Sequence, residues 1–421
     1  MNQAGSWLKL ENAGKIFPST SGKRNTGVFR FSCELTERIQ KAPLQQALDQ
    51  TLECFPHFLY ILRNGLFWYY LEAGDLRPKV HEENTGVCSQ LFYRNQRHLL
   101  FDVSYYRNRI NLEVYHALTD GTGALQFLQY LLCAYLSGVH PGQVPRELAD
   151  ELSPAPISSR AEDSFKKYYQ HVKKVRSGLP GRAYRLTGRF SEEYRVTEGL
   201  MYCRQVLDLA KAYDSTLTVF LCALLMISIH REMMLYKEKK PVVITVPVNL
   251  RQYFSSETTR NFFGNIRVAY RFQEGEENLE DIIASLKSSF ERELTQDRLK
   301  SRISGYMAVE RNPFAKIAPL SFKNFCLRIA RRVSDFGETM VVSNVGKVKL
   351  PEEISPFVES FSVFASTAKL QVCVCSCGDA LSVGFSSRYE DTDIQRNFFR
   401  LLSGMGVDVE IKSNASVREK D

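Results

Sequence analysis

A long stretch without hydrophobic periodicity divides this chain of 421 residues into two segments. Residues 140–159 contain four prolines, and residues 161–189 are basic and polar and include Gly178, Pro180 and Gly181. Such a composition is typical of a linker or crossover and not of a packed core. Because one hydrophobic core rarely grows beyond about 250–300 residues, we expect two core-forming units, residues 1–180 and 181–421.

Both segments mix strand and helix patterns. In the first, residues 99–106 and 109–115 predict a hairpin, which a helix follows at about residues 122–136. In the second, the β-branched run PVVITVPV at 241–248 is typical of a strand buried on both faces, and residues 279–294 have the spacing of an amphipathic helix. The sequence therefore predicts an α+β fold with two lobes, each a mixed sheet with helices.

A histidine stands where the first predicted hairpin meets its helix, in the sequence HALTDG at residues 116–121. Ile110, Leu112 and Val114 alternate along the strand, and His116 shares their parity, so its side chain is expected to face the interior. An imidazole there is typical of a general base, because its ordinary pKa lies near neutrality, or of a core histidine with a hydrogen-bond partner. The spacing alone leaves both interpretations open.

The H-x-x-x-D-G pattern resembles the signature of CoA-dependent acyltransferases with the chloramphenicol-acetyltransferase-like fold. That superfamily includes alcohol acetyltransferases, plant BAHD acyltransferases, polyketide-associated acyltransferases and the condensation domains of peptide synthetases. Three further segments resemble the family in its order: VPVNLR at 246–251, NFFGN at 261–265 and TMVVSNVG at 339–346. The similarity spans nearly the whole chain, and it is strongest to the stand-alone alcohol-acetyltransferase-like branch.

The resemblance implies roles for four residues. His116 would be the base that deprotonates an acceptor hydroxyl or amine, and the two substrates would meet it from opposite ends of a tunnel between the lobes. Asp120 would pair with Arg251 and hold the geometry, although an ordinary surface charge is the alternative for this carboxylate. Gly121 would leave room for substrate beside the histidine, which is compatible with its position at the start of a helix.

Two residues of the TMVVSNVG segment are candidates for a further role. A tetrahedral intermediate needs a hydrogen-bond donor aimed at its oxyanion, and the resemblance puts Ser343 and Asn344 near the tunnel. A simple turn at residues 344–346 is the other interpretation. The chain also departs from the family, because condensation domains often carry a second histidine where this chain has Tyr115, and the BAHD tryptophan motif is absent. The tyrosine weakens the interpretation as a peptide-bond-forming enzyme, because single-histidine motifs are normal among O-acyltransferases.

The balance of 55 Lys and Arg against 47 Asp and Glu gives a net charge of +8. The basic residues form only short clusters without interleaved aromatic side chains, so we expect no nucleic-acid partner. Solvated surfaces account for most of this charge, and the phosphates of CoA are the anionic ligand that fits the remainder. The sequence does not identify which lysines and arginines contact those phosphates.

The ten cysteines are scattered, apart from Cys373, Cys375 and Cys377. These three alternate with other residues, which predicts one face of a buried strand and not a zinc site, because zinc sites usually pair C-x-x-C motifs. We therefore expect no bound metal.

The sequence thus predicts an acyltransferase that moves an acyl group from acyl-CoA, its co-substrate, to an alcohol or amine. A condensation-type or polyketide-associated enzyme that takes its acyl group from a carrier protein is one alternative, and a non-catalytic relative is another. We expect no carrier or adenylation region and no secretory signal, and the longest nearly apolar run is shorter than the roughly 20 residues that span a bilayer. We expect a cytoplasmic monomer without a permanently bound cofactor.

Overall fold

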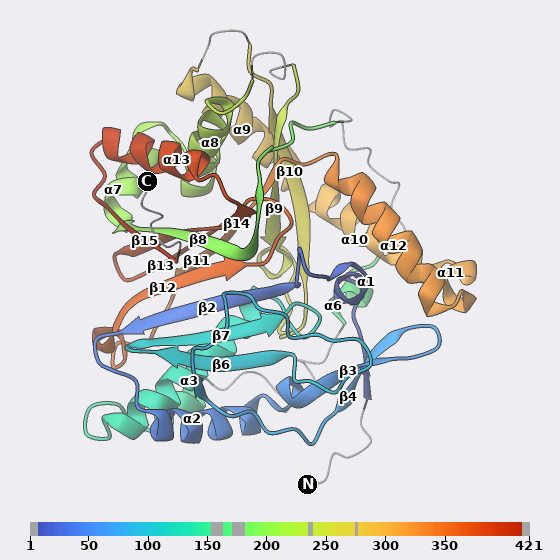
Figure 1. The fold of residues 1–421 in the computed structure, drawn as a ribbon, viewed down its shortest axis with the longest axis vertical. Helices are drawn as coiled ribbons and strands as arrows, with labels where there is room; N and C mark the ends of the chain where they lie inside the picture. Colours follow the sequence, from blue (N-terminus) through green and yellow to red (C-terminus); the bar gives the residue numbers. More distant parts are fainter. Residues whose placement is uncertain (1–6, 153–162, 171–181, 235–238, 274–276, 415–421) are drawn as a thin grey trace.

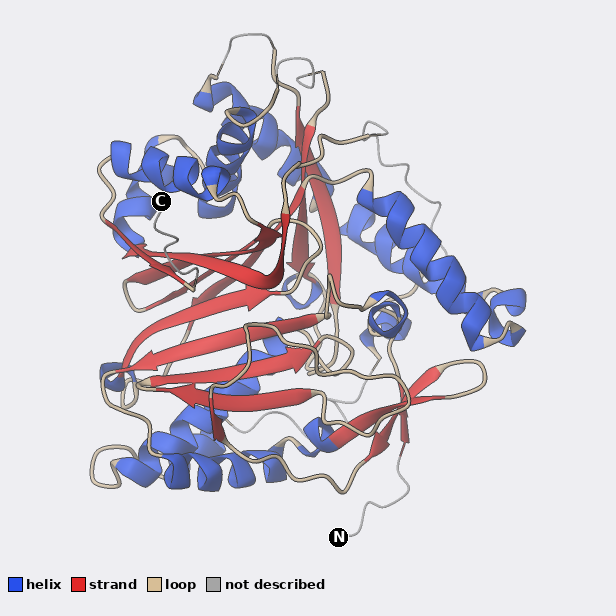
Figure 2. Ribbon diagram, viewed as in Figure 1, coloured by secondary structure: helices blue, strands red, loops and turns tan. Residues whose placement is uncertain are grey.

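The computed structural model describes residues 7–152, 163–170, 182–234, 239–273 and 277–414 (Figures 1 and 2). The elements of the N-terminal segment are β1 (Trp7–Lys9), α1 (Ile16–Thr20), β2 (Val28–Leu35), α2 (Lys41–Cys54), β3 (Tyr60–Asn64), β4 (Tyr69–Ala73), β5 (His81–Glu82), β6 (Phe101–Tyr106), β7 (Arg109–Tyr115), α3 (Gly121–Val139), α4 (Glu147–Glu151) and α6 (Ser164–Lys167). Those of the C-terminal segment are β8 (Phe190–Tyr202), α7 (Cys203–Ala212), α8 (Leu217–His230), β9 (Val242–Asn249), β10 (Phe263–Tyr270), α9 (Leu279–Glu293), α10 (Gln296–Arg311), α11 (Pro313–Ile317), α12 (Leu320–Asp335), β11 (Met340–Val348), β12 (Val358–Ala365), β13 (Gln371–Cys377), β14 (Ala380–Tyr389), α13 (Asp393–Gly404) and β15 (Val409–Ser413).

The N-terminal lobe is built on a five-stranded sheet in the order β12-β2-β7-β6-β5. Strand residues alternate between its faces, and Phe31 and Leu112, which are register partners, belong to the core formed with α2 and α3. Figure 1 shows both helices along the outer face of this sheet. A smaller sheet, β1-β4-β3, lies beside it. The hairpin and the helix predicted around residue 116 are therefore both present.

The C-terminal lobe has a seven-stranded sheet in the order β10-β9-β11-β13-β14-β8-β15, with α7, α8, α9 and α13 on its outer face (Figure 1). Strand β9 is buried on both faces at Val242, Val243 and Ile244, as its β-branched sequence predicts. Strands β9 and β11 run parallel but share only two register pairs, ending at Thr245 and Val341. Beyond these residues the described sheet is open between the two strands.

One strand crosses between the lobes. Strand β12 belongs to the C-terminal segment of the sequence, yet it pairs antiparallel with β2 and completes the N-terminal sheet. It also contacts β13, where the thiol of Cys375 donates to the Phe361 carbonyl at 3.0 Å. Residues 358–365 of the predicted C-terminal unit therefore complete the N-terminal sheet, and the predicted boundary near residue 180 lies outside the described residues.

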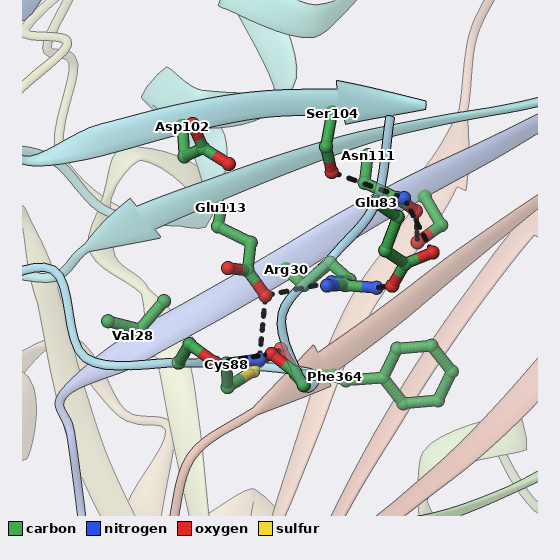
Figure 3. A network of polar contacts seen from close by, with 12 residues as sticks. Val28, Arg30, Glu83, Cys88, Asp102, Ser104, Asn111, Glu113 and Phe364 are labelled. Atoms are coloured by element: carbon green, nitrogen blue, oxygen red, sulfur yellow. Dashed lines mark hydrogen bonds and ion pairs between the residues drawn. The ribbon is translucent and has the colours of Figure 1, made fainter. Parts of the chain in front are cut away.

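A buried polar network occupies the second face of the N-terminal sheet (Figure 3). The guanidinium of Arg30, only 2% exposed, forms ion pairs with Glu113 (Nε to Oε1, 2.8 Å) and with Glu83. Arg109 also binds Glu83, at 2.7 Å. Burial opposes ionisation of Glu83, but the charges and hydrogen bonds of Arg30 and Arg109 together outweigh it and lower the pKa of this carboxylate. Two cations thus neutralise two carboxylates, which is what allows charged groups on a buried face.

No single helix among the described residues is long and apolar enough to cross a membrane. Helices α7 and α8 pass such a test only when taken together, and they are bent by 84° relative to each other.

Candidate active site

His116 is the first residue of the turn between β7 and α3. Its backbone N–H donates to the Gly27 carbonyl at 2.9 Å, and its carbonyl accepts from Nδ2 of Asn261, also at 2.9 Å. Gly27 directly precedes β2, whereas Asn261 lies just before β10. Both halves of the chain therefore hold the backbone of His116.

Aromatic side chains surround the His116 ring. Phe17 of α1 stacks on it with ring centres 4.7 Å apart and planes at 8°, and Phe29 of β2 lies at 4.4 Å on a tilted plane. Phe263 of β10 lies at 6.2 Å. This burial lowers the pKa of His116 to about 4, and the negative charge of Asp120 opposes the shift without cancelling it. The imidazole is therefore neutral near pH 7, the form that accepts a proton.

The side chain of His116 is only partly buried as a whole, so part of it remains accessible. Its Nδ1 is buried and makes no hydrogen bond to any described residue. The Thr119 backbone and the Asn261 side chain lie near enough to act on the ring, and both raise its pKa by less than burial lowers it.

Asp120 caps the N-terminus of α3. Its Oδ1 accepts from the backbone N–H groups of Thr122 (3.1 Å) and Gly123 (3.2 Å), as expected for an N-cap. Its Oδ2 accepts from Nη1 of Arg251 (2.8 Å) and from the backbone N–H of Phe262 (2.9 Å). Four donors, two from each lobe, thus bond this carboxylate.

Arg251 lies in the turn after β9 and makes the other half of this ion pair. Its Nε and Nη2 donate to the Thr258 carbonyl at 3.0 and 2.9 Å, and Nη2 also donates to the Arg260 carbonyl. One guanidinium therefore fixes the connection between β9 and β10 and ties it to α3. The pairing of Asp120 with Arg251 that the resemblance implies is present in the structure.

Asn261, which the sequence analysis named only as part of the NFFGN segment, is a central connector. Besides holding the His116 carbonyl, its Nδ2 donates to the buried carboxylate of Glu11. Glu11 pairs in turn with Arg260, with 2.6 Å between Oε2 and Nη2. The NFFGN segment could have drawn attention to Asn261, whereas no pattern around Glu11 predicts its contact with Asn261.

Gly123 permits a close approach of the two lobes. A Cβ atom there would lie 2.3 Å from the Thr259 carbonyl oxygen and 2.2 Å from Oγ1 of Thr119, whose hydroxyl donates to the same carbonyl. A Cβ on Gly121 would meet only Phe31, at 3.9 Å, so the space beside Gly121 is open. The family resemblance implies a role for Gly121, whereas no sequence pattern predicts the steric requirement at Gly123.

Ser343 and Asn344 lie on β11, and neither shares a hydrogen bond with His116. Their side chains point to opposite faces of the sheet. Nδ2 of Asn344 donates to Oγ1 of Thr218 in α8 (2.8 Å), and its Oδ1 accepts from the Gly346 N–H (2.8 Å). The amide of Asn344 is thus occupied by structural bonds, whereas no described residue bonds the Ser343 hydroxyl.

A pocket of about 520 Å³ lies on the helix side of the C-terminal sheet, between α7, α8 and the ends of β11, β13 and β14. Asn344 and Gly346 border it, as do three basic side chains, Arg204, Lys211 and Lys347, and two acidic ones, Asp208 and Asp379. Lys211 pairs with Asp208 at 3.4 Å, so the lining has an excess of one positive charge.

Within the described parts of the chain, no group of three His, Cys, Asp or Glu side chains could hold a metal ion. Cys373, Cys375 and Cys377 are buried on one face of β13, as their spacing predicts.

No protein-family model and no curated protein sequence matches the chain. Solved structures do resemble it. The TRI3 trichothecene 15-O-acetyltransferase of Fusarium sporotrichioides has a TM-score of 0.63 at 11% identity, over 95% of this chain and 94% of its own. The first condensation domain of the CDA synthetase scores 0.61 at 16% identity (96% and 97%). TRI101 of F. sporotrichioides, solved with coenzyme A and T-2, scores 0.61 at 11% identity (97% and 100%).

Structural similarity at 11–16% sequence identity establishes the fold alone. The chain has the two-lobed chloramphenicol-acetyltransferase-like fold that acetyltransferases and condensation domains share, as the sequence resemblance predicts.

Gly121 and Gly123, both in the first turn of α3, make a matched pair for a stability measurement. We expect Gly123→Ala to lower the free energy of unfolding by about 2 kcal/mol or more, because its methyl group would overlap the Thr259 carbonyl. Gly121→Ala should be neutral or slightly stabilising, because alanine is the better helix former and meets only Phe31. Urea unfolding followed by circular dichroism measures both, and equal midpoints would contradict the steric requirement at Gly123.

Proposed function

We propose that this protein transfers an acyl group from acyl-CoA to a hydroxyl or amine acceptor, with His116 as the general base. One observation carries the proposal: a neutral, partly accessible imidazole, with no hydrogen bond on Nδ1, is held by backbone contacts from both lobes. The shared fold with acetyltransferases supports the reaction class.

The reaction balances without a covalent enzyme intermediate. The acceptor O–H or N–H gives its proton to His116 as the acceptor attacks the thioester carbonyl, and a tetrahedral oxyanion forms. When the oxyanion collapses, the C–S bond breaks and the imidazolium returns the proton to the leaving thiolate. Positioning both substrates at one histidine removes much of the entropic barrier to a two-substrate reaction.

The surrounding residues have supporting roles in this proposal. Asp120 and Arg251 are positioning residues, because their bonds fix α3 and the β9–β10 connection on either side of His116. Ser343 is the better of the two candidates for an oxyanion donor, because its hydroxyl is not committed to a described partner, whereas the Asn344 amide is. The open space beside Gly121 is where we expect substrate to approach.

The basic pocket beside Asn344 is our candidate for the anionic part of the donor. CoA carries a diphosphate and a 3′-phosphate, and Arg204 and Lys347 supply cations around a space of about 520 Å³, whereas Lys211 is paired with Asp208. TRI101 was solved with coenzyme A, and a starter condensation domain of rhizomide synthetase with C8-CoA, which supports a CoA thioester as co-substrate. A carrier-protein thioester is the alternative, because condensation domains share the fold.

The role of His116 predicts a loss of activity without a loss of structure. We expect His116→Ala to reduce acyl transfer by 10²- to 10⁴-fold, the usual contribution of a general base. Release of free thiol from acetyl-, octanoyl- and palmitoyl-CoA in the presence of an alcohol and amine panel measures the rate. The exposed His98→Ala is the matched control, and near-UV circular dichroism checks the fold. An unchanged rate in His116→Ala would refute the proposal.

The lowered pKa of His116 predicts an unusual pH profile. The base is active when neutral, so its activity is retained above the folded pKa and lost as the pH falls through about 4. We therefore expect kcat/KM to stay level from about pH 8 to pH 5.5, whereas a histidine with an ordinary pKa would lose half its activity near 6.5. Samples returned to pH 7 control for acid denaturation. An acid limb centred near 6.5 would contradict the desolvated state of the ring.

An acyl donor without phosphates distinguishes an effect on phosphate binding from an effect on the chemical step. We expect Arg204→Glu and Lys347→Glu each to raise the KM for acyl-CoA about 10-fold, because each reverses a charge in the pocket. Acyl-N-acetylcysteamine keeps the thioester but lacks phosphates, so its kcat/KM should not change. Lys41→Glu, exposed at the start of α2, is the control. Equal effects on both donors would exclude this pocket as the phosphate site, and a wild-type enzyme that accepts only carrier-bound acyl groups would favour the alternative donor.

A further inference from the structure

Helix α12 is amphipathic in the reverse sense to an ordinary surface helix. Its apolar stripe consists of Phe322, Phe325, Ile329 and Val333 and continues into Phe336 just past its end. These side chains are 59%, 58%, 45%, 64% and 43% exposed. They recur at intervals of three and four residues, so they share one face along about 21 Å of helix. A surface helix normally turns such a stripe toward the core.

The polar side chains of α12 face inward instead. Lys323 and Asn324 are its only buried residues. Nδ2 of Asn324 donates to the Tyr69 hydroxyl (2.9 Å), and its Oδ1 accepts from the Ser19 hydroxyl (2.6 Å). Nζ of Lys323 donates to the Phe67 carbonyl at 2.9 Å. These bonds fix the rotation of the helix, so the exposure of its apolar stripe is set by specific contacts.

The exposed apolar surface extends beyond α12. Phe314 and Ile317 of α11 are 80% and 71% exposed, and Leu66 and Phe67 project from the β3–β4 turn. This turn is attached to α12, because the Leu320 N–H donates to the Leu66 carbonyl at 3.0 Å. Figure 1 shows α11, α12 and the β3–β4 hairpin projecting on one side of the molecule. We call this set, residues 66–67 and 314–336, the α12 surface.

The α12 surface includes more than half of the large apolar side chains that are exposed in the described protein. A contiguous patch of this kind marks an interaction site, because leaving it in water costs free energy that a partner recovers.

The charge of the α12 surface indicates which kind of partner it binds. Residues 313–336 contain Lys316, Lys323, Arg328, Arg331 and Arg332 against one acidic residue, Asp335. Lys316 and Arg332 are exposed, and no described acidic residue pairs with either of them. A second copy docked on the same face would bring like charges together. An anionic surface would attract them.

Further positive charge lies at the base of the same surface. Nζ of Lys323, Lys15 and Lys9 approach the ring of Trp68 at 3.6, 4.9 and 5.9 Å. Three ammonium groups around one indole produce a strong positive potential beside the apolar stripe. An exposed apolar face with flanking lysines and arginines is the pattern of helices that lie in the interface of an anionic bilayer.

We propose that the α12 surface binds the protein peripherally to anionic lipid bilayers, with the stripe of α12 seated among the acyl chains and Lys316 and Arg332 at the headgroups. This inference does not depend on the acyl-transfer activity. It requires no membrane-spanning segment, because a helix of this kind lies along the interface.

Sedimentation with vesicles tests the proposal on the full chain. We expect the wild type to bind vesicles of phosphatidylcholine with 30% phosphatidylglycerol and to bind pure phosphatidylcholine at least about 10-fold more weakly. Phe322→Ser with Phe325→Ser should reduce binding to the anionic vesicles at least about 10-fold, as should Lys316→Glu with Arg332→Glu. All four side chains are exposed, so the fold should be unaffected. Ile411→Ser, an exposed apolar position on β15, should bind like the wild type.

Cys326 supplies a direct probe, because it is exposed beside the stripe while the other nine cysteines are buried or half-buried. An environment-sensitive fluorophore on Cys326 should shift to shorter wavelength with anionic vesicles, and Cys326→Ser controls for labelling elsewhere. Three results would overturn the proposal: no binding to any vesicle, equal binding by the Phe322→Ser, Phe325→Ser variant, or light scattering that shows a dimer in which Cys326 resists labelling. The last would assign the surface to contact between two copies.

Discussion

The site depends on one carboxylate that both lobes share. Asp120 accepts two backbone bonds from the first turn of α3, one from Phe262 and one from the Arg251 guanidinium. Burying two charges is costly, and the attraction between them offsets that cost only when every remaining hydrogen-bonding group is also satisfied. Here the arginine is satisfied by the carbonyls of Thr258 and Arg260. The pair therefore contributes geometry more than stability, because it sets where α3 ends and where the β9–β10 connection must lie.

The position and the protonation state of His116 follow from that arrangement. The same connection supplies Asn261 to the His116 carbonyl and Phe263 to the vicinity of its ring. The remaining aromatic contacts come from Phe17 and Phe29, so the imidazole loses water on nearly every side. Desolvation penalises the imidazolium, and the opposing charge of Asp120 is smaller than this penalty, so the pKa stays lowered.

Sequence reasoning was accurate where the signal is local. Alternation predicted the β6–β7 hairpin, the buried strand β9 and the shared face of Cys373, Cys375 and Cys377, because strand periodicity depends on neighbouring residues. Long-range pairings were harder. The pattern of β12 indicates a strand but not that its partner is β2, more than 300 residues earlier. The roles of Gly123 and Asn261 likewise arise from contacts across the lobe boundary. Only the family resemblance, and no periodicity, could link Asp120 to Arg251.

The orientation of helix α12 is also decided by long-range contacts and not by local periodicity. Its spacing of Phe322, Phe325, Ile329 and Val333 is what a core-facing helix would have, and the sequence alone would orient it inward. The orientation is decided by Asn324, Arg328 and Ser19, since the Ser19 hydroxyl donates to Asn324 and its carbonyl accepts from Nε of Arg328 at 3.0 Å. Ser19 belongs to α1, the five-residue helix whose Phe17 stacks on His116. The same short helix therefore contacts both the α12 surface, through Ser19, and the proposed base, through Phe17.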